Sequence, residues 1–157
     1  MPHEITGTCI GCTACASICP TEAIYGEKKM LHHIIPERCI DCAACSAVCP
    51  VECILDEHEE IKPRRKLAAL PKAKVIEESC TGCEFCVDVC PYGCISLKSG
   101  AKVEGVLAVA DVDPGKCVGC GLCVAVCDKE AILVYDQEGN QLDHAMLKIF
   151  EINEYSR

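Results

Sequence analysis

Apolar residues along this chain fall in short runs that are interrupted by polar residues, glycines and prolines. Short runs of this kind predict strands, which we place at Leu31–Ile35, Lys74–Glu77, Val106–Val112 and Ile132–Tyr135. Residues 98–115, KSGAKVEGVLAVADVDPG, read as an extended hairpin. Because no apolar run reaches 18 residues, the sequence predicts no membrane span.

A repeated cysteine pattern overlies these runs. The spacing C-x2-C-x2-C-x3-C occurs four times, at Cys9, Cys12, Cys15, Cys19; at Cys39, Cys42, Cys45, Cys49; at Cys80, Cys83, Cys86, Cys90; and at Cys117, Cys120, Cys123, Cys127. Two-residue gaps let a tight loop wrap three corners of a cubic cluster. The fourth cysteine lies about 6 Å further along if that segment is helical, and so faces a second cluster. The small residues between the cysteines allow close approach of the backbone and its N–H donors.

Pro20, Pro50 and Pro91 follow the first three copies. This run of cysteines and proline resembles that of the bacterial-type two-cluster ferredoxins, in which the fourth cysteine of each motif reaches the other cluster. The resemblance implies an α+β fold of two tandem ferredoxin modules, with short strand pairs, short helices and two cluster-binding loops in each.

The same resemblance implies four 4Fe–4S clusters with crossed ligands. Cluster one is expected on Cys9, Cys12, Cys15 and Cys49; cluster two on Cys39, Cys42, Cys45 and Cys19; cluster three on Cys80, Cys83, Cys86 and Cys127; cluster four on Cys117, Cys120, Cys123 and Cys90. Zinc is disfavoured, because its sites use separated C-x2-C pairs around one ion. Disulfides need an oxidising compartment, and the N-terminus MPHEITGTCIGC lacks the features of a signal peptide.

Two of the 18 cysteines fall outside the motifs. The residues that follow each fourth cysteine align as CPTEAI, CPVECI, CPYGCI and CDKEAI, so Cys53 and Cys94 stand where Ala23 and Ala131 stand in the other copies. We expect both to be small buried packing residues and not ligands. A ligand swap or a redox-sensing role is the alternative.

We expect the chain to divide into four parts. Residues 1–56 form the first module, 57–72 a basic linker, 73–140 the second module with an extended insert, and 141–157 a C-terminal tail. The linker is either a solvated connector or a docking element. The tail covers either its own module or a neighbouring protein.

Several residues near the motifs have local interpretations. Asp128 replaces the proline of the fourth copy, and either caps a short helix or tunes the nearby potential. Tyr25 and Tyr135 are expected to pack over clusters. The five histidines lack ligand spacing, so solvated or structural roles are expected for His3, His32, His33, His58 and His144.

The chain as a whole resembles a polyferredoxin. The net charge of −9 argues against nucleic acid as a ligand. The resemblance implies a cytoplasmic, non-catalytic carrier that relays single electrons, with the clusters as its cofactors. Neither a nucleophile nor a general base can be identified.

More narrowly, the chain is similar to the iron–sulfur subunits of tungsten-dependent aldehyde oxidoreductase and benzoyl-CoA reductase complexes of anaerobic metabolism. That similarity implies a large catalytic oxidoreductase subunit as partner, with a tungsten or molybdenum enzyme as the specific candidate and a flavin or ferredoxin protein as the other redox partner. The alternatives are a freely diffusing ferredoxin and an enzyme that uses an open iron site.

Overall fold

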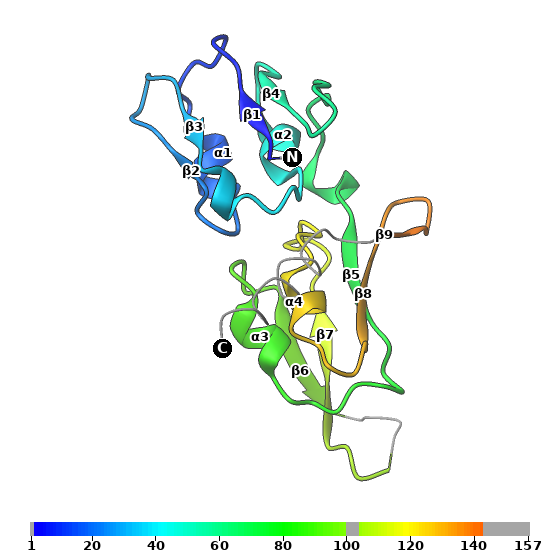
Figure 1. The fold of residues 1–157 in the computed structure, drawn as a ribbon. Helices are drawn as coiled ribbons and strands as arrows, with labels where there is room; N and C mark the ends of the chain where they lie inside the picture. Colours follow the sequence, from blue (N-terminus) through cyan, green and yellow to red (C-terminus); the bar gives the residue numbers. More distant parts are fainter. Residues whose placement is uncertain (1, 100–103, 143–157) are drawn as a thin grey trace. The chain divides into compact units, whose positions relative to one another are not determined.

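The computed structural model describes residues 2–99 and 104–142. Within it the chain separates into two compact units, Met1–Ala69 and Leu70–Arg157 (Figure 1). Each unit contains two of the cysteine motifs. Of the expected C-terminal tail, only Gln141 and Leu142 are among the described residues.

The first unit consists of very short elements. Its strands are β1 (Glu4–Ile5), β2 (Ile24–Tyr25), β3 (His33–Ile34) and β4 (Ile54–Leu55), and its helices are α1 (Ala14–Ile18) and α2 (Ala44–Val48). Two 3-10 turns, Pro36–Arg38 and Leu67–Ala69, complete it. Strand β1 pairs antiparallel with β4, with Ile5 opposite Ile54, and β2 pairs antiparallel with β3, with Ile24 opposite Ile34.

The second unit repeats this plan with longer strands. Its elements are β5 (Lys72–Val75), α3 (Phe85–Val89), β6 (Ile95–Ser99), β7 (Ala108–Val112), α4 (Leu122–Ala125), β8 (Ile132–Tyr135) and β9 (Gln141–Leu142). Strand β5 pairs antiparallel with β8, and β6 with β7. Strand β9 adds a third strand beside β8.

The two units therefore share one order of pairing. In each, the strand before the first motif pairs with the strand after the second motif, and the two strands between the motifs pair with each other. This arrangement brings the two motif helices together, α1 against α2 in one unit and α3 against α4 in the other. Consecutive motifs thus face each other inside a single unit.

The strands predicted from the apolar runs are present, with shifted ends in three cases. Ile132–Tyr135 is strand β8 as predicted, whereas β3 occupies only His33–Ile34 of the run at 31–35. The hairpin expected at 98–115 is the β6–β7 pair, in which Ile95 lies opposite Val112. Its residues 100–103 are outside the described part.

Part of the basic segment that was expected to be a linker contacts the first unit. The Arg65 amide donates to the Ala47 carbonyl at 2.9 Å, and the Arg64 amide donates to Glu52 Oε1 at 2.9 Å. The Lys62 ammonium forms an ion pair with Asp56 at 3.1 Å. Residues 62–65 are therefore anchored by backbone and side-chain contacts.

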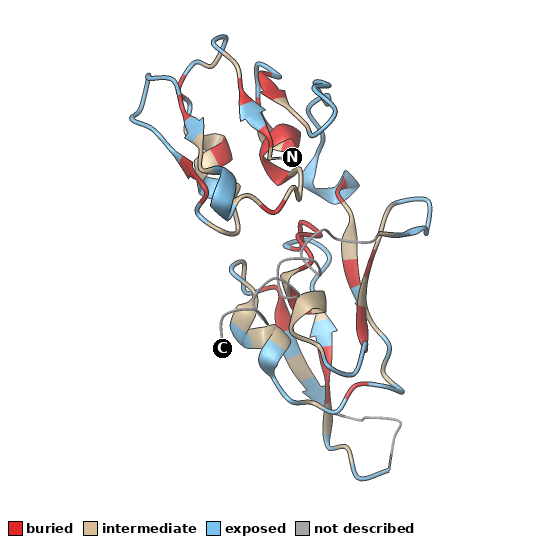
Figure 2. Cartoon of the chain, in the orientation of Figure 1, coloured by how far each residue is buried: buried red, intermediate tan, exposed pale blue. Residues whose placement is uncertain are grey.

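Each unit has a core of aliphatic side chains and cysteines. Figure 2 shows the buried segments of both units in red. In the first unit, Ile5, Ile24 and Ile54 pack with buried cysteines. In the second, Val109, Ile132 and Val134 do the same, and none is more than 2% exposed. Because large side chains normally dominate core energetics, such cores leave a large share of the interior to the cysteine loops.

The loops approach neighbouring backbone closely at glycines with positive φ. Gly82 has φ +70°, and a Cβ placed there would lie 2.4 Å from the Ala108 carbonyl oxygen. Gly119, with φ +70°, would place a Cβ 2.6 Å from the Pro71 carbonyl oxygen. These positions need glycine both for the left-handed backbone and for the space.

We expect Gly82→Ala to lower the melting temperature more than Gly93→Ala. Both positions have positive φ, which costs an alanine about 1–2 kcal/mol, but a Cβ at Gly93 meets no described atom within 4 Å. Gly7→Ala, which has neither constraint, should be neutral. Thermal unfolding followed by circular dichroism checks this order. Equal losses for Gly82→Ala and Gly93→Ala would show that the contact with Ala108 is unimportant.

Candidate metal centres

Each cysteine motif folds as a loop followed by a helix of four or five residues. A residue with left-handed backbone precedes each helix, namely Thr13, Ala43, Glu84 and Gly121. The third cysteine lies in the helix. In the first three copies the fourth cysteine ends it in extended conformation, as the following proline requires.

The fourth copy ends differently. Helix α4 stops at Ala125, and Val126 keeps helical backbone angles. Asp128, which replaces the proline, is exposed, and its carboxylate lies 3.1 Å from the Lys129 ammonium. An exposed pair of this kind contributes little to stability.

Four cavities contain the sixteen motif cysteines, two cavities in each unit. In the first unit, one cavity is lined by Cys9, Cys12, Cys15 and Cys49, and the other by Cys19, Cys39, Cys42 and Cys45. In the second unit, one is lined by Cys80, Cys83, Cys86 and Cys127, and the other by Cys90, Cys117, Cys120 and Cys123. Each cavity thus collects three cysteines of one motif and the fourth cysteine of its neighbour.

Backbone amides point at the cysteine sulfurs. The donors and acceptors are Gly11 to Cys9 (3.4 Å), Ala23 to Cys19 (3.2 Å), Cys53 to Cys49 (3.5 Å), Ala73 to Cys117 (3.4 Å), Ala110 to Cys80 (3.4 Å) and Ala131 to Cys127 (3.3 Å). An N–H directed at sulfur stabilises the thiolate form and not the thiol. The cavities are therefore prepared for thiolate ligands.

Comparison with known families agrees with this geometry. Models of the 4Fe-4S dicluster domain match residues 4–55 and residues 79–131, and a third model with the same description matches residues 35–94. The first two matches each contain one pair of motifs that the structure places in one unit.

The chain carries 4Fe-4S dicluster domains. The match to residues 35–94 overlaps both of the others and joins the second motif to the third. The cavities pair the first motif with the second and the third with the fourth. Cys49 lies in the cavity of the first motif, and Cys127 lies in the cavity of the third. This grouping agrees with the matches to residues 4–55 and 79–131 and not with the match to residues 35–94.

Other comparisons add little. No curated protein matches the chain. Among solved structures, a chain of the formate dehydrogenase–heterodisulfide reductase–formylmethanofuran dehydrogenase complex from Methanospirillum hungatei is similar, with 24% identity and a TM-score of 0.46. The match covers 95% of this chain and 56% of that one. In residues 2–99 and 104–142, no helix has the length and apolar character needed to cross a membrane.

The donor sets of the dicluster domains fit a cluster held by four thiolates. Burial, with a further contribution from the neighbouring Cys12 and Cys9, raises the pKa of Cys15 to about 11. Burial, followed by Cys120 and Cys117, raises the pKa of Cys123 to about 12. Crowded thiols of this kind ionise only when a metal neutralises their charge.

Cys53 and Cys94 lie in two of the four cavities. Cys53 lines the cavity of Cys9, Cys12, Cys15 and Cys49, and Cys94 lines the cavity of Cys90, Cys117, Cys120 and Cys123. Their exposed fractions are 2% and 6%. Burial, with the neighbouring Cys49 thiol, raises the pKa of Cys53 to about 12. Burial likewise raises the pKa of Cys94, with the Cys90 thiol as the next cause.

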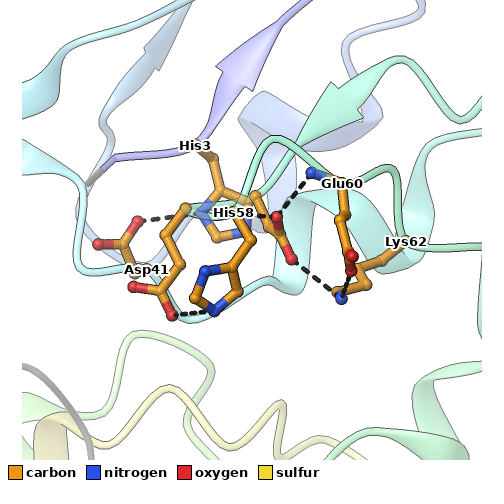
Figure 3. A network of polar contacts seen from close by, with 7 residues as sticks. His3, Asp41, His58, Glu60 and Lys62 are labelled. Carbon is orange, nitrogen blue, oxygen red and sulfur yellow. Dashed lines mark hydrogen bonds and ion pairs between the residues drawn. The ribbon is translucent and has the colours of Figure 1, made fainter.

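His3 has a position that sequence reasoning missed. It is 5% exposed, lines the cavity of Cys39 and Cys42, and its Nδ1 lies 3.0 Å from Asp41 Oδ1. Figure 3 shows this pair beside the exposed polar contacts of Glu60 and Lys62. Ligand atoms of His3, Asp41 and Cys39 lie within 4.8 Å of one another, so the pair belongs to the surroundings of the cavity that Cys39, Cys42 and Cys45 line.

His32 occupies the related position at the other cavity of the first unit. It is 1% exposed and lines the cavity of Cys9 and Cys12, and its Nδ1 lies 3.0 Å from the Met30 carbonyl oxygen. His3 and His32 each precede a short strand, β1 and β3. The sequence signal is HEI before the first motif and HHI before the second, which spacing to the cysteines alone did not reveal.

We expect Cys19→Ser to disturb the cluster of the second motif. If ligands are shared as the cavities group them, this variant and Cys42→Ser should weaken the same component of the electron paramagnetic resonance spectrum. Each should also lose up to about four irons per chain. Cys19 suits the test because Ala23, and no second thiol, follows it at the fourth position. Loss of the component that Cys12→Ser removes would refute crossed ligation.

Proposed function

We propose that the chain is a non-catalytic electron carrier that holds four 4Fe–4S clusters on crossed sets of four cysteines. The observation that carries this proposal is the grouping of the sixteen motif cysteines into four cavities. Each cavity has three cysteines of one motif and the fourth cysteine of its neighbour. Two dicluster-domain matches at the two ends of the chain support it. When bound, each cluster takes up and releases one electron.

The residues of the chain set the conditions for that exchange. Left-handed residues bend each loop so that three sulfurs face one cavity. Backbone amides that donate to Cys9, Cys80 and Cys117 stabilise negative charge on the sulfurs, and so favour the reduced state. Buried aliphatic side chains around the cavities limit the access of water.

The helices determine how two clusters of a unit are connected. Cys15 and Cys19 stand at either end of the α1 segment, and each lines a different cavity. Cys86 and Cys90 have the same relation along α3. About one helical turn therefore lies between the ligands of neighbouring clusters, which gives electrons a short route within each unit.

One ligand of cluster one and one ligand of cluster three reach the surface. Cys12 and Cys83 are exposed, whereas the ligands of clusters two and four are buried or half-buried. Large apolar side chains lie beside both, since Ile10 is 55% exposed and Phe85 is 59% exposed. Apolar side chains next to an exposed cluster edge suit contact with a protein partner. We therefore propose that the chain works as a subunit of an oxidoreductase complex.

The partner that we propose is a large catalytic oxidoreductase subunit in the cytoplasm. A tungsten or molybdenum enzyme is the specific candidate, from the resemblance of the sequence to the iron–sulfur subunits of such complexes. A flavin or ferredoxin protein is the proposed second redox partner. The exposed edges of clusters one and three supply one contact region in each unit.

Anaerobic isolation of the tagged chain from its host should yield about sixteen irons per chain, four for each cluster. A large subunit that contains tungsten or molybdenum should be recovered with it at fixed stoichiometry. Metal analysis and mass spectrometry measure both quantities. Sixteen irons without a stoichiometric partner would indicate a freely diffusing ferredoxin, and zinc in place of iron would overturn the proposed function.

Phe85→Asp should reduce recovery of the partner about tenfold while iron content stays unchanged. A buried aromatic contact at an interface contributes about 1.4 kcal/mol or more, which corresponds to that factor. Ile61→Asp is the matched control, because Ile61 is 52% exposed and lines none of the four cysteine cavities. Equal recovery with Phe85→Asp and Ile61→Asp would place the contact elsewhere.

A further inference from the structure

The two cysteines outside the motifs contact the sulfurs of motif cysteines. Cys53 Sγ lies 3.6 Å from Cys49 Sγ, and Cys94 Sγ lies 3.2 Å from Cys90 Sγ. Both distances are within the range of a hydrogen bond that involves sulfur. The same contact occurs in both units, at equivalent positions of CPVEC and CPYGC.

Each extra thiol shares its cavity with a further motif sulfur. Cys53 lines the same cavity as Cys9, and Cys94 lines the same cavity as Cys117. Cys49 and Cys9 both belong to the set of cluster one, and Cys90 and Cys117 both belong to the set of cluster four. Each thiol therefore contacts one cysteine of a proposed ligand set and shares a cavity with the rest of that set.

The direction of these hydrogen bonds follows from the chemistry of the ligands. A cysteine bound to iron is a thiolate, which accepts hydrogen bonds and has no hydrogen to donate. Cys53 and Cys94 are not in the ligand sets and keep their S–H groups. They are the donors, and the ligand sulfurs are the acceptors.

We propose that Cys53 and Cys94 donate S–H···S hydrogen bonds to ligand sulfurs and thereby raise the reduction potentials of clusters one and four. The inference rests on the proposed function, because it requires the clusters to be bound. Reduction adds negative charge that spreads onto the ligand sulfurs, so a donor at those sulfurs stabilises the reduced state. One cluster in each unit receives this extra donor.

The other two clusters provide an internal comparison. Ala23 and Ala131 occupy the same position in the first and fourth motifs, and their amides donate to Cys19 and Cys127 at 3.2 and 3.3 Å. The backbone contact is thus shared with Cys53, whose amide donates to Cys49 at 3.5 Å. The thiol is the difference, so its effect is separable from that of the backbone.

The test uses the full chain with all clusters reconstituted under anaerobic conditions. Redox titration followed by electron paramagnetic resonance should show one component of lower potential in Cys53→Ala and a different one in Cys94→Ala. At a fixed ambient potential, the ratio of reduced to oxidised cluster should fall severalfold, up to about tenfold, which is about 59 mV for one electron. Cys53→Ser retains a donor and should recover part of the shift.

Iron content separates the outcomes. Unmoved potentials with full iron in Cys53→Ala and Cys94→Ala would show that both residues only fill space, and would overturn the inference. Iron loss from Cys53→Ala, with normal circular dichroism, would make Cys53 a ligand and would also overturn it. By contrast, a wild-type chain that takes up no 4Fe–4S cluster would overturn the proposed function itself.

A second variant works in the opposite direction and does not depend on the removal of a cysteine. Ala131→Cys places a thiol beside Cys127 in the fourth motif, where the backbone contact to sulfur is already present. The potential of cluster three should rise by a similar factor. An unmoved potential in this variant with full iron content would count against the inference as strongly as unmoved potentials in the two alanine variants.

Discussion

Four sulfur atoms cannot share a small cavity as thiolates unless positive charge lies among them. The pKa values show this cost: burial and the neighbouring cysteines raise the pKa of Cys15 to about 11 and that of Cys123 to about 12. A thiol sulfur is a weaker acceptor than a thiolate for the backbone amides that point at the motif cysteines. Because these loops fill much of each core, iron binding and folding should be coupled.

The need to close two such cavities in one small unit explains the chain path. A helix of five residues is too short to be stable alone, yet α1 and α3 each connect a third cysteine to a fourth that faces the other cavity. That connection requires the second motif to return beside the first. The outer strand pair, β1 with β4 and β5 with β8, brings it back. In the first unit, strands of only two residues are enough for this, because the cysteine loops on either side also pack together.

The sequence was informative where spacing along the chain determines position. The ferredoxin resemblance carried by the cysteine spacing and by the prolines after Cys19, Cys49 and Cys90 implied loops and short helices, which the structure contains. Strand β8 was predicted to the residue because Ile132–Tyr135 is a compact apolar run. By contrast, β3 is shorter than its apolar run, since only its paired residues meet the β2 strand.

What spacing could not show is which side chains meet across the fold. His3 and His32 are distant in the sequence from the cysteines whose cavities they line in the structure. Their burial beside these cavities therefore depends on strand pairing. Cys53 was correctly placed in a buried position. Its place in the cavity of Cys9 could not be predicted, because it depends on the pairing of β1 with β4. The alignment of Cys53 with Ala23 predicted that Cys53 is buried, but it could not predict which side chains surround it.

The two units share a plan but differ at their clusters. In the first, the set that includes the exposed Cys12 also has the extra thiol of Cys53. In the second, the exposed Cys83 belongs to one set and the thiol of Cys94 contacts the other, which is more buried. If four clusters bind as proposed and the thiols raise potentials, an electron in the first unit rests at the cluster of the set that includes Cys12. In the second unit it rests at the cluster of the buried set that Cys94 contacts. The two units would therefore differ in how fast they exchange electrons with a partner.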